Sequence, residues 1–239
     1  MNIHYVTEGK GAPIVFFHGW GFDCHIWSPL IHPLSASYQL ILVDLPGFGL
    51  TPMMEWDAFK EQLLKIMPPQ CTLAGWSLGG LYAQRLALEV PGRIRSLVNI
   101  TSSPRFITDS EWPATSKESF FSFCEKMVSN PEKTLNDFIQ LQRVKSNVSC
   151  LLGEKPSIEG LNEGLKILET WDLRQLLAEC RLPACYLFGR LDPIVPVAVM
   201  EKMKQEYPQF DYVLFKKSAH MPFISDKDLF IELLKRYVE

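Results

Sequence analysis

Short, nearly unbroken apolar runs recur along the chain, separated by longer amphipathic segments. Continuous apolar runs of this kind are typical of parallel strands that helices cover on both faces. Alternation of such strands with helical segments predicts a doubly wound, mostly parallel α/β sheet. An amphipathic helix is expected from about 226 to 238. The expected buried strands cover residues 13–18, 38–44, 94–100, 184–189 and 211–215, and a further strand leads into a glycine-rich turn at 75–79.

The strand pattern disappears between Pro104 and about Leu176, where helical stretches such as 118–128 and 134–144 take its place. We predict that residues 104–176 form a helical cap, inserted into a core made of residues 1–103 and 177–239. The alternative, that this segment continues the core, is disfavoured by the length of the helical interlude. An insertion beside the edge where the strands end would shape access to a site there.

Composition narrows the class of protein. A chain of 239 residues with 47% hydrophobic residues can bury a substantial core in one large α/β domain. The formal net charge of −3 argues against nucleic acid as a general partner. The sequence has neither a charged leader followed by an apolar segment nor a run of roughly 18 apolar residues that would span a bilayer. We therefore expect a cytoplasmic protein without a membrane partner, and a monomer.

The six cysteines are scattered and have no Cys-x-x-Cys spacing, which indicates reduced, mostly buried thiols. The histidines also lack ligand spacing, and the neighbouring Cys24 and His25 are interpreted as incidental packing. We expect no metal and no cofactor.

A Gly-x-Ser-x-Gly sequence at 75–79 lies between a strand-like run and a helix-like run. This arrangement is typical of a nucleophile elbow, in which a serine occupies a strained conformation on a tight turn. The residues two before and two after that serine must be small, and Gly75 and Gly79 meet this requirement. Ser77 is therefore the candidate nucleophile. An ordinary strand-to-helix turn is the alternative, and the flanking apolar segments disfavour it.

A serine hydroxyl is a poor nucleophile at neutral pH and needs a histidine to accept its proton and a carboxylate to orient that histidine. His220 follows the strand-like run 211–215, and Asp192 follows the run 184–189. Both would emerge at the carboxyl edge of the sheet. The order Ser77, Asp192, His220 is the order found in α/β-hydrolases.

Asp44 also follows a strand and competes with Asp192 for the carboxylate role. The alternative role for Asp44 is structural: its carboxylate would accept hydrogen bonds from backbone donors in the turn at 46–49. We prefer Asp192.

Ester hydrolysis also needs backbone donors for the oxyanion. The amide of Leu78, directly after the nucleophile, is one candidate, and the Trp20 amide in the glycine-flanked loop after the first strand is the second. Gly19 and Gly21 would let that backbone approach a substrate, and His18 is expected to brace the loop. The Trp20 side chain could instead be an ordinary core aromatic.

Several motifs resemble the α/β-hydrolase superfamily from end to end: FHGWG at 17–21, DLPGFG at 44–49, GWSLGG at 75–80, GRLDPIVP at 189–196 and AHMPFIS at 219–225. A narrower resemblance, to the pimeloyl-[acyl-carrier protein] methyl ester carboxylesterase family of biotin synthesis, comes from TSSP at 101–104 with EWP at 111–113, GLKIL at 164–168 with DLRQ at 172–175, and AHMPFIS at 219–225.

This resemblance implies a cytoplasmic serine esterase that removes the methyl group from a pimeloyl chain carried on acyl carrier protein, its partner. It implies Ser77 as nucleophile, His220 as base and Asp192 as the residue that steadies the imidazolium. The implied substrate contacts are Trp20, Ser77, Leu78, Phe138, Ile139, Gln140, Leu141, Gln142 and His220. Because Phe138 and Leu141 are three apart on one helix face, they suit an aliphatic chain, although ordinary cap packing would give the same pattern.

Carrier docking is expected to use basic residues because acyl carrier protein is strongly acidic. The candidates are Lys133, Arg143, Lys145 and Lys155. Asp137 lies among them and the cap as a whole is not basic, so solvated helix faces explain these charges equally well.

Other functions fit parts of the pattern. A broad esterase for short acyl or aryl esters, or a carbon–carbon bond hydrolase, would use the same three residues. A dehalogenase is disfavoured because it needs a carboxylate where Ser77 stands. A catalytically silent binding module of the same fold is disfavoured by the presence of Ser77, Asp192 and His220 together.

Overall fold

The centre of the computed structural model, which describes residues 2–142 and 153–239, is a seven-stranded sheet. Its strand order is β1-β3-β2-β4-β5-β6-β7, with β1 antiparallel to β3 and all other neighbours parallel. The expected α/β-hydrolase sheet is therefore confirmed. The strands are β1 (Tyr5–Glu8), β2 (Ala12–Phe17), β3 (Tyr38–Val43), β4 (Cys71–Trp76), β5 (Ile94–Ile100), β6 (Ala184–Gly189) and β7 (Asp211–Phe215).

Alternate residues of the parallel strands enter two separate apolar cores, one on each face of the sheet. In β2, Val15 and Phe17 belong to one core and Ile14 and Phe16 to the other. Both faces are buried, which explains why the strands appear in the sequence as unbroken apolar runs. On the first face lie α2 (Trp56–Ile66), α3 (Leu78–Glu89) and α8 (Val197–Glu206); on the second lie α1 (Ser28–Ser35), α9 (Pro222–Ser225) and α10 (Lys227–Val238). Shorter helices are η1 (Cys24–Trp27), η2 (Pro91–Arg93) and α7 (Arg174–Ala178).

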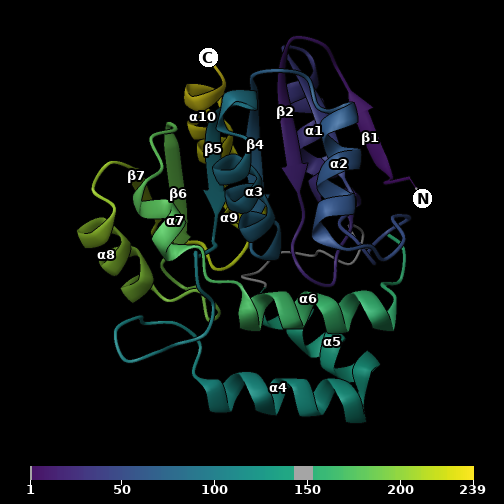
Figure 1. The fold of residues 1–239 in the computed structure, drawn as a ribbon, viewed down its shortest axis with the longest axis vertical. Helices are drawn as coiled ribbons and strands as arrows, with labels where there is room; N and C mark the ends of the chain where they lie inside the picture. Colours follow the sequence, from purple (N-terminus) through teal and green to yellow (C-terminus); the bar gives the residue numbers. More distant parts are fainter. Residues whose placement is uncertain (1, 143–152) are drawn as a thin grey trace.

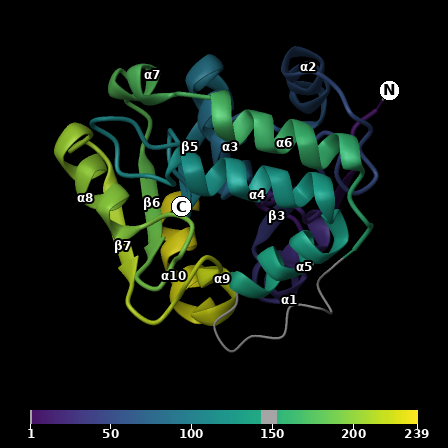
Figure 2. The same ribbon diagram turned by 90° about the horizontal axis from the view of Figure 1, so that it is seen from below.

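Three helices, here called the cap helices, lie across the end of the sheet where the parallel strands end (Figures 1 and 2). They are α4 (Lys117–Ser129), α5 (Pro131–Leu141) and α6 (Ile158–Thr170). Each is preceded by a capping residue whose side chain accepts a hydrogen bond from a first-turn amide: Ser116, Asn130 and Ser157. The cap helices enclose space above the strand ends, which is where the site residues emerge.

The strand pattern predicted β5, β6 and β7 with their observed bounds, and the final helix begins one residue later than expected. β1 was not predicted, because four half-exposed residues give too short a signal. The helix expected at 134–144 begins earlier, at Pro131, since Asn130 caps it and proline is favoured at a first helical position. It ends at Leu141, and Val144 lies outside the described residues.

The domain bounds 104–176 and 177–239 stay a prediction; the second junction falls inside α7. Among the helices of the described residues, none has the length and apolar character needed to cross a membrane.

Candidate active site

Ser77 stands between β4 and α3 in a backbone conformation that side chains rarely adopt. Its φ is 54° and its ψ is −117°. Such a conformation costs about 1–3 kcal/mol and persists only where the surroundings hold it. The holding contacts are hydrogen bonds from Ser77 N to Ile100 O at 3.0 Å and from Ser102 Oγ to Ser77 O at 2.7 Å. The serine side chain is thereby presented at the end of the sheet, 6% exposed.

The glycines around Ser77 are required by close backbone approaches. A Cβ on Gly75 would collide with the carbonyl oxygen of Gly79, and one on Gly79 would collide with the carbonyl oxygens of Phe17 and His18. The first turn of α3 therefore packs directly against the end of β2. This contact brings the amide of Leu78, the first residue of α3, next to the loop that carries Trp20.

Asp192 and His220 form a buried hydrogen-bonded pair. His220 Nδ1 lies 2.7 Å from Asp192 Oδ2, and both side chains are at most 1% exposed. The other carboxylate oxygen accepts hydrogen bonds from Ile194 N at 2.8 Å and Val195 N at 3.1 Å. With Nδ1–H donating to the carboxylate, Nε2 of His220 is left with its lone pair available to accept a proton.

The imidazole of His220 is fixed beside the serine elbow. Trp76, the residue before Ser77, packs its ring on the His220 ring at 5.7 Å between centroids and donates from Nε1 to His220 O at 2.8 Å. Thr101 Oγ1 donates to the same carbonyl oxygen at 2.8 Å. Nε2 of His220 is buried without a hydrogen-bond partner among the described residues, so Ser77 Oγ is not hydrogen-bonded to it in this structure; contacts between a catalytic serine and its base often tighten only when substrate binds.

Gly189 allows the Asp192 loop to meet the His220 loop. A Cβ at this last residue of β6 would overlap the carbonyl oxygen of Ala219, and Leu191 N donates to Ser218 O at 3.0 Å. The two loops therefore run in backbone contact, which places the carboxylate within reach of the imidazole.

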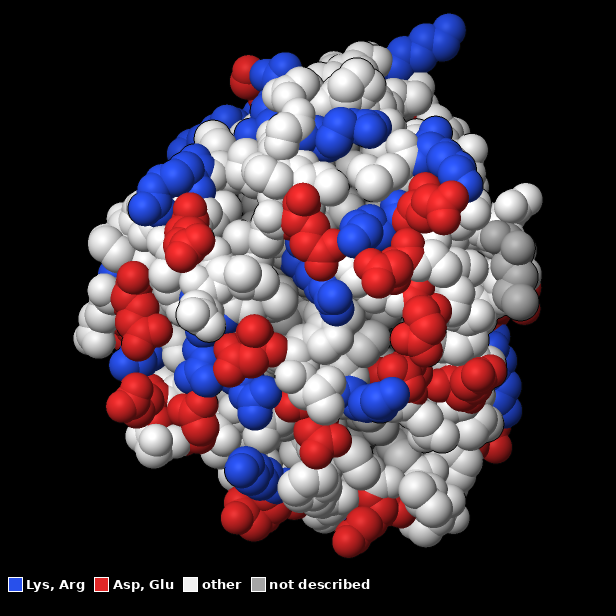
Figure 3. Space-filling model, in the orientation of Figure 1, with Lys and Arg blue, Asp and Glu red and all other residues white. Residues whose placement is uncertain are grey.

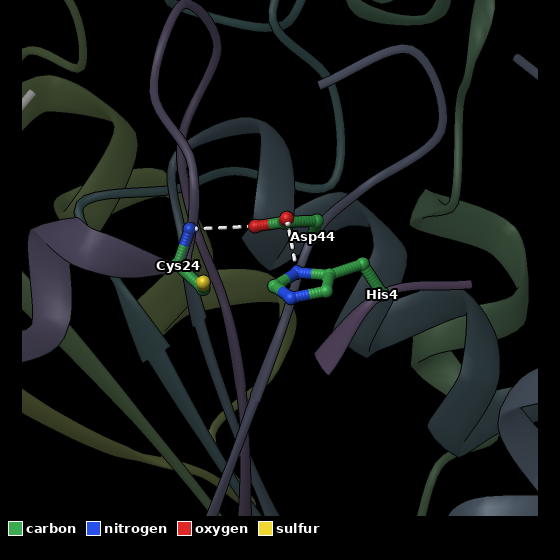
Figure 4. Close-up of side chains that lie close together, drawn as sticks. All are labelled: His4, Cys24 and Asp44. Atoms are coloured by element: carbon green, nitrogen blue, oxygen red, sulfur yellow. Dashed lines mark hydrogen bonds and ion pairs between the residues drawn. The ribbon is translucent and has the colours of Figure 1, made fainter. Parts of the chain in front are cut away.

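Asp44 has a different set of partners (Figure 4). Its carboxylate accepts from Cys24 N at 2.8 Å and Leu50 N at 3.0 Å, and His4 Nδ1 lies 2.7 Å away. It joins three chain segments and does not contact His220. The ligand-type atoms of His4, Cys24 and Asp44 lie within 4.8 Å of one another. Both carboxylate oxygens are already engaged, and burial raises the pKa of the Cys24 thiol, so these contacts form a hydrogen-bonded junction.

His18 holds the loop after β2. Its Nδ1 donates to Gly19 O at 2.8 Å, and its Nε2 accepts from Leu45 N at 3.0 Å. Complete burial lowers the pKa of this imidazole, and the nearby Asp44 carboxylate opposes that effect only in part. A neutral His18 satisfies both hydrogen bonds at once.

A cavity of about 170 Å³ lies between the strand ends and the cap helices. Ser77 is one of its lining residues, and the rest of the lining is almost wholly apolar, without a charged side chain among the described residues. Such a cavity suits an uncharged aliphatic or aromatic group next to the serine. The lining residues are Trp20, Ser77, Phe106, Ile107, Thr115, Ser119, Phe120, Phe123, Phe138, Leu141, Leu165, Leu168, Pro193 and Ile194.

Of the predicted substrate contacts on α5, Phe138 and Leu141 line this cavity. Ile139 faces the other side of the helix and is buried in the second core. Gln140 is exposed, and Gln142 donates from Nε2 to Phe138 O at 3.2 Å. Direct contact of these last three residues with substrate stays a prediction.

Several lining residues were not predicted from the sequence. Phe120 and Phe123 on α4, and Leu165 and Leu168 on α6, are each three apart, the same spacing that selected Phe138 and Leu141. The spacing could have identified these pairs, but only the way the helices pack decides which apolar stripe faces Ser77.

The predicted carrier-docking cations are only partly described. Lys133 Nζ lies 2.5 Å from Asp137 Oδ2, and Lys155 Nζ lies 3.7 Å from Glu132 Oε1. Arg143 and Lys145 lie outside the described residues. Acidic and basic side chains are interspersed on the face seen in Figure 3.

Comparison with known proteins agrees with the fold. The signature of the alpha/beta hydrolase family matches residues 14–233, so the chain belongs to that family. Among solved structures, an esterase from Exiguobacterium antarcticum has a TM-score of 0.91 at 21% identity, covering 99% of this chain and 95% of that one. An enol-lactonase from Burkholderia xenovorans has a TM-score of 0.85 at 19% identity, covering 99% and 96%.

Relatives with higher sequence identity identify a narrower family within the α/β-hydrolases. A pimeloyl-[acyl-carrier protein] methyl ester esterase from Legionella pneumophila (strain Paris) is 54% identical over the full length of both chains. The esterase of the same name from Aeromonas salmonicida is 34% identical, again with full coverage of both. Within the α/β-hydrolases, the chain belongs to the family of these esterases.

Proposed function

We propose that this protein is a serine carboxylesterase that hydrolyses the methyl ester of pimeloyl-[acyl-carrier protein] methyl ester, giving pimeloyl-[acyl-carrier protein] and methanol in biotin synthesis. The observation that carries the proposal is the buried Asp192–His220 pair beside a strained Ser77 that lines an apolar cavity. The names and the full-length similarity of the relatives supply the substrate. We propose that the enzyme works as a cytoplasmic monomer.

The geometry supports a two-step reaction. Ser77 Oγ attacks the ester carbonyl carbon while His220 Nε2 takes its proton, and the Asp192 carboxylate stabilises the resulting imidazolium. The amides of Leu78 and Trp20 donate to the carbonyl oxygen as it becomes an oxyanion. His220 returns the proton to the departing methoxide, which leaves as methanol.

The acyl-enzyme is then hydrolysed by the same groups. Water loses a proton to His220 Nε2 as it attacks the acyl carbon, and the collapse of the second tetrahedral intermediate returns the proton to Ser77 Oγ. The new carboxylate product meets no cationic side chain in the described lining of the cavity, so its charge favours release into water.

Complementation tests the proposal in a cell. A biotin-requiring strain without its own pimeloyl-methyl esterase receives either the natural protein or Ser77→Ala. Growth without biotin is expected from the natural protein alone. Absence of growth, despite expression of folded protein that hydrolyses a small ester, would reject the substrate assignment and leave a general esterase.

A further inference from the structure

The Trp20 side chain is held by all three cap helices, although Trp20 belongs to the core loop after β2. Its Nε1 donates to Leu161 O of α6 at 2.9 Å. Its ring packs edge-to-face on Phe123 of α4 at 5.6 Å and on Phe138 of α5 at 5.2 Å between centroids. The residue is 2% exposed. The contacts therefore join one core residue to every cap helix.

Gly164 on α6 provides the space for this indole. A Cβ at that position would lie 2.6 Å from Trp20 Cδ1 and 3.3 Å from Leu78 Cδ2. Because Gly164 has no side chain, α6 can pack closely against Trp20 and Leu78, the two residues whose amides are the proposed oxyanion donors.

The backbone on either side of Trp20 is glycine, which imposes little conformational preference of its own. Gly21 has a φ of 82°, and a Cβ on Gly19 would lie 2.9 Å from the Trp76 ring. Within the core, the peptide that carries the Trp20 amide is held at Gly19 O, which accepts hydrogen bonds from His18 Nδ1 at 2.8 Å and Phe22 N at 3.3 Å. The indole adds the hydrogen bond and the ring contacts that couple this backbone to the cap helices.

Phe123 and Phe138, which clamp the indole, also line the cavity beside Ser77. An acyl chain in that cavity would pack against the same two rings. Filling the cavity would therefore stabilise the position of the indole, and through it the position of the Trp20 amide.

We propose that Trp20 is a positioning residue through which the cap and the bound acyl chain set the oxyanion donor. The inference rests on the proposed function, in that the Trp20 amide is taken as a donor to the oxyanion. Its consequence is that acyl-chain binding energy is expressed in the transition state, so a longer acyl chain raises kcat as well as lowering KM.

The test uses purified protein and a series of p-nitrophenyl esters from acetate to hexanoate, with Ser77→Ala showing that the hydrolysis belongs to this site. Trp20→Phe keeps an aromatic ring and removes the hydrogen bond to Leu161 O. It is expected to lower kcat about 10- to 100-fold, because small displacements of catalytic groups have effects of that size, with KM changed less than about twofold. The rise of kcat with acyl length should also flatten.

Trp112→Phe is the matched control. Trp112 is 1% exposed and donates from Nε1 to Arg105 O at 3.0 Å, but it is not part of the loop after β2. The Trp112→Phe variant should lose as much stability as Trp20→Phe and keep the kcat of the natural protein. Equal losses of kcat in the two variants, or a change in KM alone for Trp20→Phe, would overturn the proposal.

Gly164→Ala changes the cap side of the contact between α6 and the Trp20 ring. The overlap of the alanine Cβ with the Trp20 ring should cost about 1–3 kcal/mol, and the preference of about 1 kcal/mol for alanine over glycine in a helix interior offsets this only in part, so kcat should fall with a small drop in the melting temperature. An unchanged kcat would contradict the coupling. Small esters distinguish failure of the proposed function from failure of the inference about Trp20. If the natural protein hydrolyses small esters but not the carrier substrate, only the proposed function is rejected. If it hydrolyses neither, both proposals are rejected.

Discussion

The two carboxylate oxygens of Asp192 have different tasks. Oδ1 is fixed by the amides of Ile194 and Val195, and Oδ2 holds Nδ1–H of His220. An ionised carboxylate can accept on both sides, whereas an amide can accept on one side only. The orientation of the His220 imidazole therefore depends on Asp192 being an acid.

Asp192→Asn should place its amide oxygen toward the two backbone donors and its NH2 toward His220. The imidazole would then carry its proton on Nε2, where it cannot act as a base. We expect kcat on a small ester to fall about 10³- to 10⁴-fold with little change in melting temperature.

Asp44→Asn tests the other candidate carboxylate in the same way. Asp44 joins His4, Cys24 and Leu50, so its replacement should lower the melting temperature and leave kcat of the folded protein close to normal. If Asp44→Asn abolished kcat and Asp192→Asn did not, the carboxylate assignment would be reversed.

His18 gives a stability signal that depends on pH. Burial lowers its pKa below the ordinary value of 6.5, so below about that pH the unfolded chain binds a proton that the folded chain does not. Its contribution to stability is complete above the unfolded pKa and is lost as pH falls below it.

Denaturant titrations at pH 7 and pH 5 check this. The free energy of unfolding should decrease more on acidification in the natural protein than in His18→Gln, whose amide oxygen can still accept from Leu45 N. Parallel decreases would show that His18 does not contribute.

At the scale of elements, the site is made by loops brought together at glycines. Gly189 lets the turn after β6 touch the turn after β7, and Gly79 lets α3 begin against the end of β2. These are backbone contacts, so the separation of the site groups is set by the register of the sheet and not by flexible side chains.

Gly189→Ala should therefore damage both stability and activity. Its Cβ would overlap the backbone of Ala219, which cannot move without shifting His220. We expect a loss of about 1–3 kcal/mol in the free energy of unfolding and a reduced kcat. Gly92→Ala, where no atom lies within 4 Å of the added Cβ, is the control and should leave both unchanged. A fully active, fully stable Gly189→Ala would contradict the role given to this contact.

The sequence predicted much of the core because local patterns determine it. Buried strands such as β6 are unbroken apolar runs, and the turns after them carry Asp192 and His220 in a recognisable order. The lining from the cap was less predictable: Phe123 and Leu165 belong to amphipathic helices whose apolar faces serve packing and the cavity alike. Which face meets Ser77 depends on tertiary packing, and so does the contact between Trp20 and α6.

At the scale of the whole molecule, the core carries the proposed reacting groups, and the cap helices supply half of the residues that line the cavity. We propose that carrier recognition uses surface charge at Lys133 and Lys155, each of which has a carboxylate neighbour on the cap. Exposed pairs of this kind contribute little to stability, so their lysines remain available to a partner.

The double variant Lys133→Glu, Lys155→Glu should lower kcat/KM for a carrier-bound ester about tenfold or more through slower encounter, and spare small esters. Lys10→Glu, in the exposed turn between β1 and β2 at the opposite end of the parallel strands, should change neither. Adding salt should weaken the natural protein's activity on the carrier substrate and narrow its advantage over the double variant. Equal effects of the cap and control variants would show that these cations do not dock the carrier.

The most direct test of the account is the intact mass of acyl carrier protein loaded with the pimeloyl methyl ester, measured after incubation with the purified protein. The natural protein should convert the carrier to the species lighter by one CH2, the free pimeloyl acid, and release methanol, whereas Ser77→Ala should leave the ester intact. A natural protein that hydrolyses p-nitrophenyl esters but leaves the mass of the loaded carrier unchanged would contradict the assignment.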